Sequence, residues 1–199
     1  MKDQIMANSI EQAEQTQRLE AAIQSRQLGM VKDAGLVIGA SLLMAISAHI
    51  SFPLLGPVPF TMQPLALLLI AFFLGPRRAA ASMIAYLLEG ASGLPVFSPA
   101  GPGGIAQLMG PTGGFLMATP FAAFVGGYIS RKKSAVYLVC AAIAAEIVLF
   151  TFGASWFNFV AHSTIALSMS LAVLPFLPGE ILKMAVAVSA ASLWNRRQA

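Results

Sequence analysis

The sequence predicts an all-α membrane protein with six transmembrane helices, both termini in the cytoplasm, and ordered Gly/Pro-rich outer loops over an outward-facing pocket. Three observations predict this fold. Of the 199 residues, 57% are hydrophobic and only 10% are charged, whereas a soluble domain carries about a quarter charged residues. The apolar residues form successive segments of helical length. With one exception, the basic residues flank these segments on one side, so nucleic acid is not expected as a partner.

The chain divides into a polar extension at 1–27 and a transmembrane substrate-binding domain at 28–199. The extension is rich in Gln and Glu and lacks the apolar core of a secretory signal. Six hydrophobic segments follow it, at 34–50, 60–74, 78–92, 113–130, 134–155 and 178–195. The second and third segments hold only about 15 residues, which reach about 22 Å across a hydrocarbon core of about 30 Å. Flanking turns or loops must therefore complete these two crossings.

The basic residues set the orientation in the lipid bilayer. With a cytoplasmic N-terminus and six crossings, eleven of the twelve Lys and Arg residues face the cytoplasm, as the positive-inside rule requires. The exception is Lys183. The apolar stretch 164–177 is short for a span and suits a re-entrant or interfacial piece. A seventh crossing would also place Arg196 and Arg197 outside.

The outer side collects the irregular backbone. The loop at 93–114 contains seven Gly and four Pro, and the loop at 51–59 and the approach to the last helix also contain Gly and Pro. Irregular backbone at membrane depth is tolerated where it is buried in protein or lines a cavity, and transporters bind substrates beside such breaks. We therefore expect a lidded pocket that opens to the exterior. The alternative is that these loops are merely tight turns.

Glu180 and Lys183 open the last helix on the outer side. They are three residues apart and share a helical face. Lys183 could bind an anion with its three donors, assisted by the helix N-terminus, and Glu180 could accept hydrogen bonds from N–H groups. The alternative is a mutual salt bridge, with Lys183 extending to the lipid headgroups. Glu146, midway along the fifth segment, is either a structural hydrogen-bonding group or part of a pathway.

Five motifs together resemble a known family. They are Val58-Pro59-Phe60-Thr61-Met62-Gln63, Leu74-Gly75-Pro76-Arg77, Gly93-Leu94-Pro95-Val96-Phe97, Gly110-Pro111-Thr112-Gly113-Gly114-Phe115 and Leu177-Pro178-Gly179-Glu180-Ile181-Leu182-Lys183. In order and approximate spacing they are similar to the BioY family, the biotin-specific substrate-binding (S) components of energy-coupling factor (ECF) transporters. The resemblance covers about 31–197.

The resemblance implies six transmembrane helices and a biotin pocket near the outer surface, in a multi-pass protein of the bacterial cytoplasmic membrane. It also implies a transmembrane coupling protein and two cytoplasmic ATPases as partners. This agrees with the absence of a GxxxxGK[ST] motif from the sequence. No cofactor is expected on this chain, because ATP is used by the partner ATPases. No metal site is expected either, because two His and one distant Cys do not make an ordinary one.

The resemblance also implies a binding site. The family's last helix usually carries PGD-x-x-K, whose acid and lysine contact the ligand; Glu180 replaces that Asp here, and Lys183 matches. Lys183 is the sole outer-side cation for biotin's carboxylate, and Glu180 would accept from the ureido ring. Gln63 and Gln107 are expected to make further contacts with the ureido ring. Phe60 and Phe97 are expected to form apolar walls. Phe115 completes the walls, in place of the family's Tyr.

The predicted function is therefore capture and transport of biotin by a protein that is not an enzyme. Three alternatives stay open. A proton-coupled secondary carrier of a small carboxylated vitamin would use Glu146 as a relay. An intramembrane serine protease would use Ser92, in Gly90-Ala91-Ser92-Gly93, with His162 downstream. A structural membrane subunit would bind no small molecule.

Overall fold

A computed structural model describes residues 1–53 and 58–198, with side chains at all of these except 2–14, 16, 21 and 22. Part of the predicted outer loop at 51–59, namely 54–57, lies outside the described residues. The chain forms two compact units, Met1–Leu36 and Val37–Ala199. The first unit is helical throughout, because helix α1 runs from Lys2 to His49. The predicted domain boundary between residues 27 and 28 stays a prediction.

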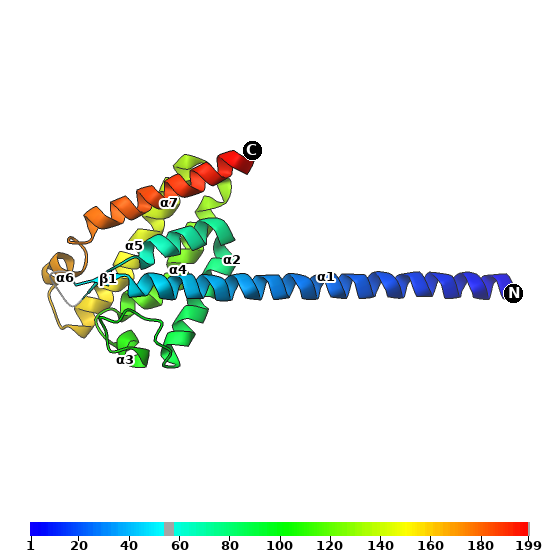
Figure 1. Ribbon diagram of the computed structural model, residues 1–199, viewed down its shortest axis with the longest axis horizontal. Coiled ribbons are helices and arrows are strands. Elements are labelled where there is room, and N and C mark those ends of the chain that lie inside the picture. Colours follow the sequence, from blue (N-terminus) through cyan, green and yellow to red (C-terminus); the bar gives the residue numbers. More distant parts are fainter. Residues whose placement is uncertain (54–57, 199) are drawn as a thin grey trace. The chain divides into compact units, whose positions relative to one another are not determined.

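The second unit is almost entirely helical (Figure 1). After the end of α1 it comprises, in order, β1 (Ser51–Phe52), β2 (Phe60–Thr61), α2 (Gln63–Ala91), α3 (Gly104–Met109), α4 (Gly113–Ile129), the 3₁₀ turn η1 (Ser130–Lys132), α5 (Ala135–Val160), α6 (Ile165–Ala172) and α7 (Leu177–Gln198). The last three predicted spans correspond to α4, α5 and α7. The stretch predicted as a re-entrant or interfacial piece contains the short helix α6.

The second and third predicted spans are two arms of one interrupted helix, α2. Gly75 breaks it with φ 76° and ψ 175°, a conformation that glycine adopts without steric cost. Pro76 follows and has no N–H to continue the helical ladder. Figure 1 shows the arms on either side of this break running in different directions. The predicted separation at Gly75-Pro76-Arg77 is thus a sharp break in α2 rather than a loop.

The all-α prediction missed one small feature. β1 and β2 pair as an antiparallel ladder, with Ser51 opposite Thr61 and Phe52 opposite Phe60. Strands of two residues carry no periodic pattern that a sequence could reveal. The ladder gives the backbone of this segment hydrogen-bond partners, which irregular chain between apolar helices requires. It also places Thr61 and Phe60 beside the start of α2.

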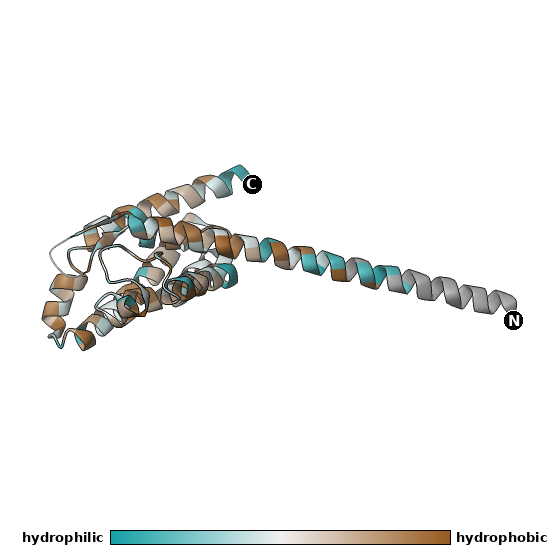
Figure 2. Ribbon diagram, turned by 60° about the horizontal axis from the view of Figure 1, so that its bottom comes forward, coloured by the Kyte–Doolittle hydropathy of each residue, from teal (hydrophilic) through white to brown (hydrophobic). Residues whose placement is uncertain are grey.

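The described residues contain four helices that are long and apolar enough to cross a membrane: Gln17–His49 within α1, α2, α4 with η1, and α5. A fifth candidate is α6 together with α7, which are bent by 53° at their junction. The chain is therefore a mostly helical membrane protein with several candidate spans. Figure 2 shows the hydropathy changing to hydrophilic at the C-terminal end of α7, where Arg196 and Arg197 lie.

The core of the second unit lies between α2, α4 and α5, and small residues dominate it. Ala71, Ala79, Ala118, Ala122 and Ala145 are all fully buried. Small side chains let helix backbones approach closely, which is how helices associate in membranes. Tyr86 and Met83 fill the remaining space and are also fully buried. This tight packing at the centre leaves open space only nearer the helix ends and the connecting segments.

Candidate ligand-binding site

A cavity lies among α2, α4, α5 and α7, under the segments that connect them. It encloses about 730 Å³ of empty space, a volume that includes its open mouth. Its lining is mainly aromatic and aliphatic, with a few polar side chains. The lining residues used below are Thr61, Gln63, Ser98, Gln107, Thr112, Phe115, Thr119, Glu146, Leu149, Phe150, Phe176 and Glu180.

Helical spacing explains how α4 and α5 line the cavity. Thr112, Phe115 and Thr119 face it from the start of α4, at intervals of three and four residues that keep them on one side. Glu146 and Phe150 lie on the cavity face of α5 at an interval of four. Each helix therefore contributes one stripe that combines a polar group with an aromatic ring.

Glu180 and Lys183 form a buried ion pair in the first two turns of α7. Lys183 Nζ donates to Glu180 Oε1 at 2.8 Å and to the Thr61 carbonyl at 2.6 Å. It also lies 3.7 Å from the centroid of the Phe60 ring. Both residues are only 4% exposed. The predicted salt bridge is thus present, but Lys183 is buried and does not extend toward headgroups.

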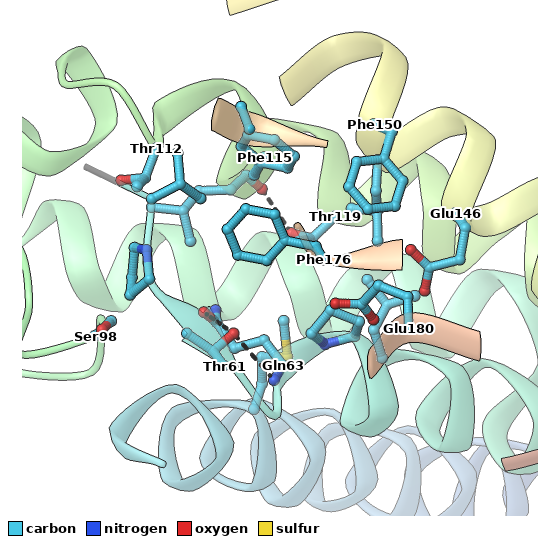
Figure 3. A pocket seen from close by; sticks show the side chains of 18 of the residues that line it. Thr61, Gln63, Ser98, Thr112, Phe115, Thr119, Glu146, Phe150, Phe176 and Glu180 are labelled. Atoms are coloured by element: carbon cyan, nitrogen blue, oxygen red, sulfur yellow. Dashed lines mark hydrogen bonds between the residues drawn. The ribbon is translucent and has the colours of Figure 1, made fainter. Parts of the chain in front are cut away.

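The cavity holds two carboxylates with free acceptor atoms. Glu180 Oε2 and Glu146 Oε1 are buried and receive no hydrogen bond from any described residue. Both residues line the cavity, and Figure 3 shows their carboxylates at the same end of it. Buried acceptors without donors are costly, so this end of the cavity is suited to a ligand that brings N–H or O–H donors.

A hydrogen-bonded chain fixes the polar wall on the α2 side. Thr61 Oγ1 donates to Gln63 Oε1 at 3.2 Å, and Gln63 Nε2 donates to the Tyr86 hydroxyl at 3.0 Å. On the loop side, Gln107 Oε1 accepts from the Gly103 N–H at 3.1 Å. Gln107 is only 3% exposed. This hydrogen bond lies within the Gly/Pro-rich segment and holds one of its cavity-lining side chains in place.

Aromatic rings form the apolar walls. Phe115 packs edge-to-face on Phe150, with ring centroids 6.2 Å apart. Phe176 stacks on Phe60 at 6.4 Å. Phe60 itself packs closely on Gly179, where a Cβ atom would overlap its ring. The start of α7 therefore packs closely against the hairpin formed by β1 and β2 because residue 179 has no side chain.

The seven sequence-predicted site residues fall into two groups. Gln63, Gln107, Phe115 and Glu180 line the cavity. The other three do not line the cavity. Lys183 binds Glu180 and Phe60 stacks on Phe176, which both line it, and Phe97 packs edge-to-face on Tyr86. Whether any of the seven binds a ligand stays a prediction.

Several lining residues were not predicted as site residues. Phe150 and Phe176 form walls that the sequence reasoning did not assign. Glu146 was considered as a structural group or a pathway residue, but not as part of the binding site. The interval of four between Glu146 and Phe150 could have placed both on one helical face. Phe176 lies directly before the Leu177–Lys183 motif, and its position there was the available signal.

The features proposed for a protease do not meet at this site. Ser92 Oγ donates to the Glu89 carbonyl at 2.7 Å, and neither Ser92 nor His162 is among the residues that line the cavity. Among the described residues, no group of three His, Cys, Asp or Glu side chains could hold a metal ion. The arrangement favours binding of a small molecule over covalent chemistry.

Together, apolar helices of spanning length and a cavity with aromatic walls and buried acceptors define a membrane-embedded small-molecule-binding protein. Comparison with known proteins makes this class specific. Residues 14–199 match the family model of the BioY family, and the chain belongs to that family. The match begins at residue 14, earlier than the resemblance at about 31–197 indicated, so it includes part of the polar extension.

Relatives and a solved structure agree with this assignment. The chain is 37% identical over 146 residues to the biotin transporter BioY of Thermotoga maritima, covering 73% of this chain and 85% of the relative. It is also 37% identical over 158 residues to the probable biotin transporter BioY of Pyrococcus horikoshii, covering 79% and 92%. The crystal structure of an S-component for biotin from an ECF-type ABC transporter matches with a TM-score of 0.75 and 25% identity, covering 84% of this chain and 93% of that one.

Proposed function

We propose that this protein captures biotin and carries it across the cell membrane as the S component of an ECF-type ABC transporter. One observation carries the proposal: the fold matches a biotin S-component over 93% of that chain, with a TM-score of 0.75. The relatives named biotin transporters support it. Transporters of this family are not enzymes, which agrees with a cavity that presents acceptors and rings rather than a nucleophile and base.

The cavity suits the parts of biotin. The fused bicycle is apolar and compact, and Phe115, Phe150 and Phe176 provide apolar walls for it. The ureido ring donates N–H groups, for which Glu180 Oε2 is a buried acceptor without a protein donor among the described residues. Figure 3 shows Ser98 and Thr112 at the other end of the cavity from Glu180. Their hydroxyl groups can donate to the carboxylate of the valeryl tail.

This arrangement assigns Lys183 a different role from the predicted contact with the carboxylate. Its ammonium already binds Glu180 and the Thr61 carbonyl, and it lies behind the lining. We propose that Lys183 holds Glu180 in place for the ligand. A direct contact between Lys183 and the carboxylate is the alternative, and it requires Lys183 to leave the Thr61 carbonyl.

The proposed topology has six crossings, with both arms of α2 crossing separately and α7 as the last span. Basic residues then lie on the cytoplasmic side at the α2 break, at η1 and at the C-terminus, as the positive-inside rule requires. The Gly/Pro-rich segments lie outside, over the cavity. This topology belongs to a multi-pass protein of the bacterial cytoplasmic membrane. A membrane-impermeant thiol reagent tests it: a Cys at Met109 should be labelled in intact cells of a C140S background, and a Cys at Gln198 should not.

The proposed partners are a transmembrane coupling protein and two cytoplasmic ATPases. The S component would bind biotin from outside, close its outer segments over the ligand, and reorient on the coupling protein when ATP is hydrolysed. Uptake that depends on the ATPases separates this mechanism from the secondary carrier. A carrier that uses Glu146 as a proton relay should transport without ATPases and stop when a protonophore collapses the proton gradient.

Biotin binding by the purified protein is the direct test. Biotin at 100 times its dissociation constant should stabilise the folded state by about 2.7 kcal/mol, and other vitamins at the same concentration should not. Titration calorimetry then measures the dissociation constant. Absence of saturable binding at micromolar biotin would contradict the proposal.

A further inference from the structure

Glu146 is the least explained polar group of the cavity. It lies in the middle of α5, is only 6% exposed, and its Oε1 atom has no hydrogen-bond donor within the described part of the chain. We propose that Glu146 is a ligand-recognising residue, which forms with Glu180 a two-acceptor site for a ligand group that carries two neighbouring N–H donors. The proposal rests on the proposed function, because the ureido ring of biotin is such a group.

The burial of Glu146 points to a ligand rather than to a structural role. A structural carboxylate in an apolar helix is expected to be paired with a donor from the protein. Glu89 Oε1 shows such pairing, since it accepts from Ser41 Oγ at 2.8 Å. Among the described residues, no donor reaches Glu146 Oε1 in a comparable way. Its side chain lines the cavity instead, so an occupant of the cavity can supply the donor.

The charges at this end of the cavity lead to the same inference. Glu146 interacts electrostatically with both Glu180 and Lys183, so two carboxylates share one ammonium group. Lys183 donates hydrogen bonds to Glu180 Oε1 and to the Thr61 carbonyl. The residues that line the cavity include no Lys, Arg or His. Ligand N–H groups would therefore supply the donors that Glu146 Oε1 and Glu180 Oε2 do not receive from the described residues.

The geometry selects a flat group with donors on both sides. Glu146 projects from α5 and Glu180 from α7, and Figure 3 shows the two carboxylates approaching the same end of the cavity from these different helices. The ring of Phe150 lies one turn beyond Glu146, and Phe176 lies near Glu180. A planar cyclic urea can lie between such rings and direct one N–H to each carboxylate. A carboxylate at this end would instead meet two acids.

The test compares two substitutions of Glu146 with matched substitutions of Glu89. Glu146→Gln keeps an acceptor and removes the charge, whereas Glu146→Met removes every acceptor at similar length. Glu89 also has a buried oxygen without a described donor, but it does not line the cavity. Glu89→Gln and Glu89→Met therefore control for the loss of a buried carboxylate. Dissociation constants are measured with the full-length purified chain, and Tm without ligand reports folding.

The ligands are biotin and the two isomeric N-methylbiotins, each of which carries a methyl group on one of the two ureido nitrogens. Glu146→Met should weaken biotin binding about 10- to 100-fold, because it leaves a buried ligand N–H without an acceptor, and Glu146→Gln should weaken it less. For one of the two isomers, the loss that methylation causes in the wild type should shrink in both Glu146 variants. For the other isomer, the loss of affinity that methylation causes should be the same in the variants as in the wild type. This is a double-mutant cycle between protein and ligand.

The arms of the experiment separate the two claims. No biotin binding by the wild type contradicts the proposed function itself. Biotin binding by the wild type with equal affinity in Glu146→Met overturns only the inference about Glu146. If Glu146→Met does not fold, Glu146→Gln carries the test, and an unchanged penalty for both methylated isomers then overturns the inference.

Discussion

Lys183 and Glu180, one helical turn apart on α7, form an ion pair of 2.8 Å in which both side chains are almost fully buried. The pair is linked to the hairpin through the Thr61 carbonyl, 122 residues away in the chain. A buried pair of this kind costs desolvation energy that its own attraction offsets only with good geometry. Its presence beside the cavity is therefore best explained by a function in presenting Glu180 Oε2 to a ligand.

The first prediction concerns the stability of this pair. Lys183→Met should lower the free energy of unfolding by about 3–5 kcal/mol, because it leaves Glu180 buried and unpaired. The double variant Lys183→Met/Glu180→Leu removes both charges and should be more stable than the single variant. Denaturant unfolding of the purified chain measures both. A double variant no more stable than Lys183→Met would contradict this prediction.

The second prediction concerns the tail of biotin. Lys183→Met should weaken the binding of biotin by about 2–5 kcal/mol, as does the loss of one member of a buried charge pair. The same substitution should weaken the binding of the methyl ester of biotin by the same factor, because Lys183 acts through Glu180. Titration of both ligands into both proteins measures this. If the wild type prefers biotin and the variant does not, then Lys183 contacts the carboxylate, as the sequence alone predicted.

The third prediction concerns closure of the Gly/Pro-rich segment. Gln107→Leu removes the acceptor for the Gly103 N–H while keeping a side chain of similar size. Loss of this hydrogen bond, which contributes about 0.5–1.5 kcal/mol, should mainly make the release of biotin faster, by about 2- to 10-fold. Stopped-flow displacement measures the dissociation rate. Met109→Leu, on the same helix α3 but 63% exposed, is the control and should release biotin at the wild-type rate.

The sequence predicted the parts of this fold that follow from local chemistry. Helices form at the predicted positions of α4, α5 and α7, since each is a long apolar segment with basic residues at one end. Of these, α7 has the length and hydropathy of a candidate span only together with α6. The break in α2 was also located, because Gly75 and Pro76 interrupt any helix. The prediction placed separate helices there, since no sequence rule distinguishes an abrupt break from a short loop.

The site was harder to predict, for a physical reason. Helix α5 is apolar on almost every side, as a membrane helix is, so its hydrophobic pattern does not mark the face that lines a cavity. Phe97 was expected in the wall, but its ring packs against Gly90 and Tyr86. The hydrogen bond from Lys183 to the Thr61 carbonyl depends on the position of the hairpin, which cannot be predicted from a local sequence pattern. Tertiary contacts thus decide which polar residues line the cavity.

The fourth prediction concerns Gly179, which lets α7 approach the hairpin. A Cβ at this position would overlap the Phe60 ring, and Phe60 lies under the Lys183 ammonium and against Phe176. Gly179→Ala should therefore displace Phe60, lower stability by about 1–3 kcal/mol, and weaken biotin binding at the same time. Unfolding and titration of the same preparation measure the two effects.

Gly39 on α1 is the matched control for Gly179. A Cβ there would meet no atom within 4 Å, and replacing a glycine inside a helix by alanine is expected to stabilise by about 0.5–1 kcal/mol. Gly39→Ala should therefore bind biotin as the wild type does and unfold at the same or higher denaturant concentration. If Gly179→Ala behaves like Gly39→Ala in both measurements, the close contact between α7 and the hairpin does not position the site. The ion pair would then owe its geometry to α7 alone.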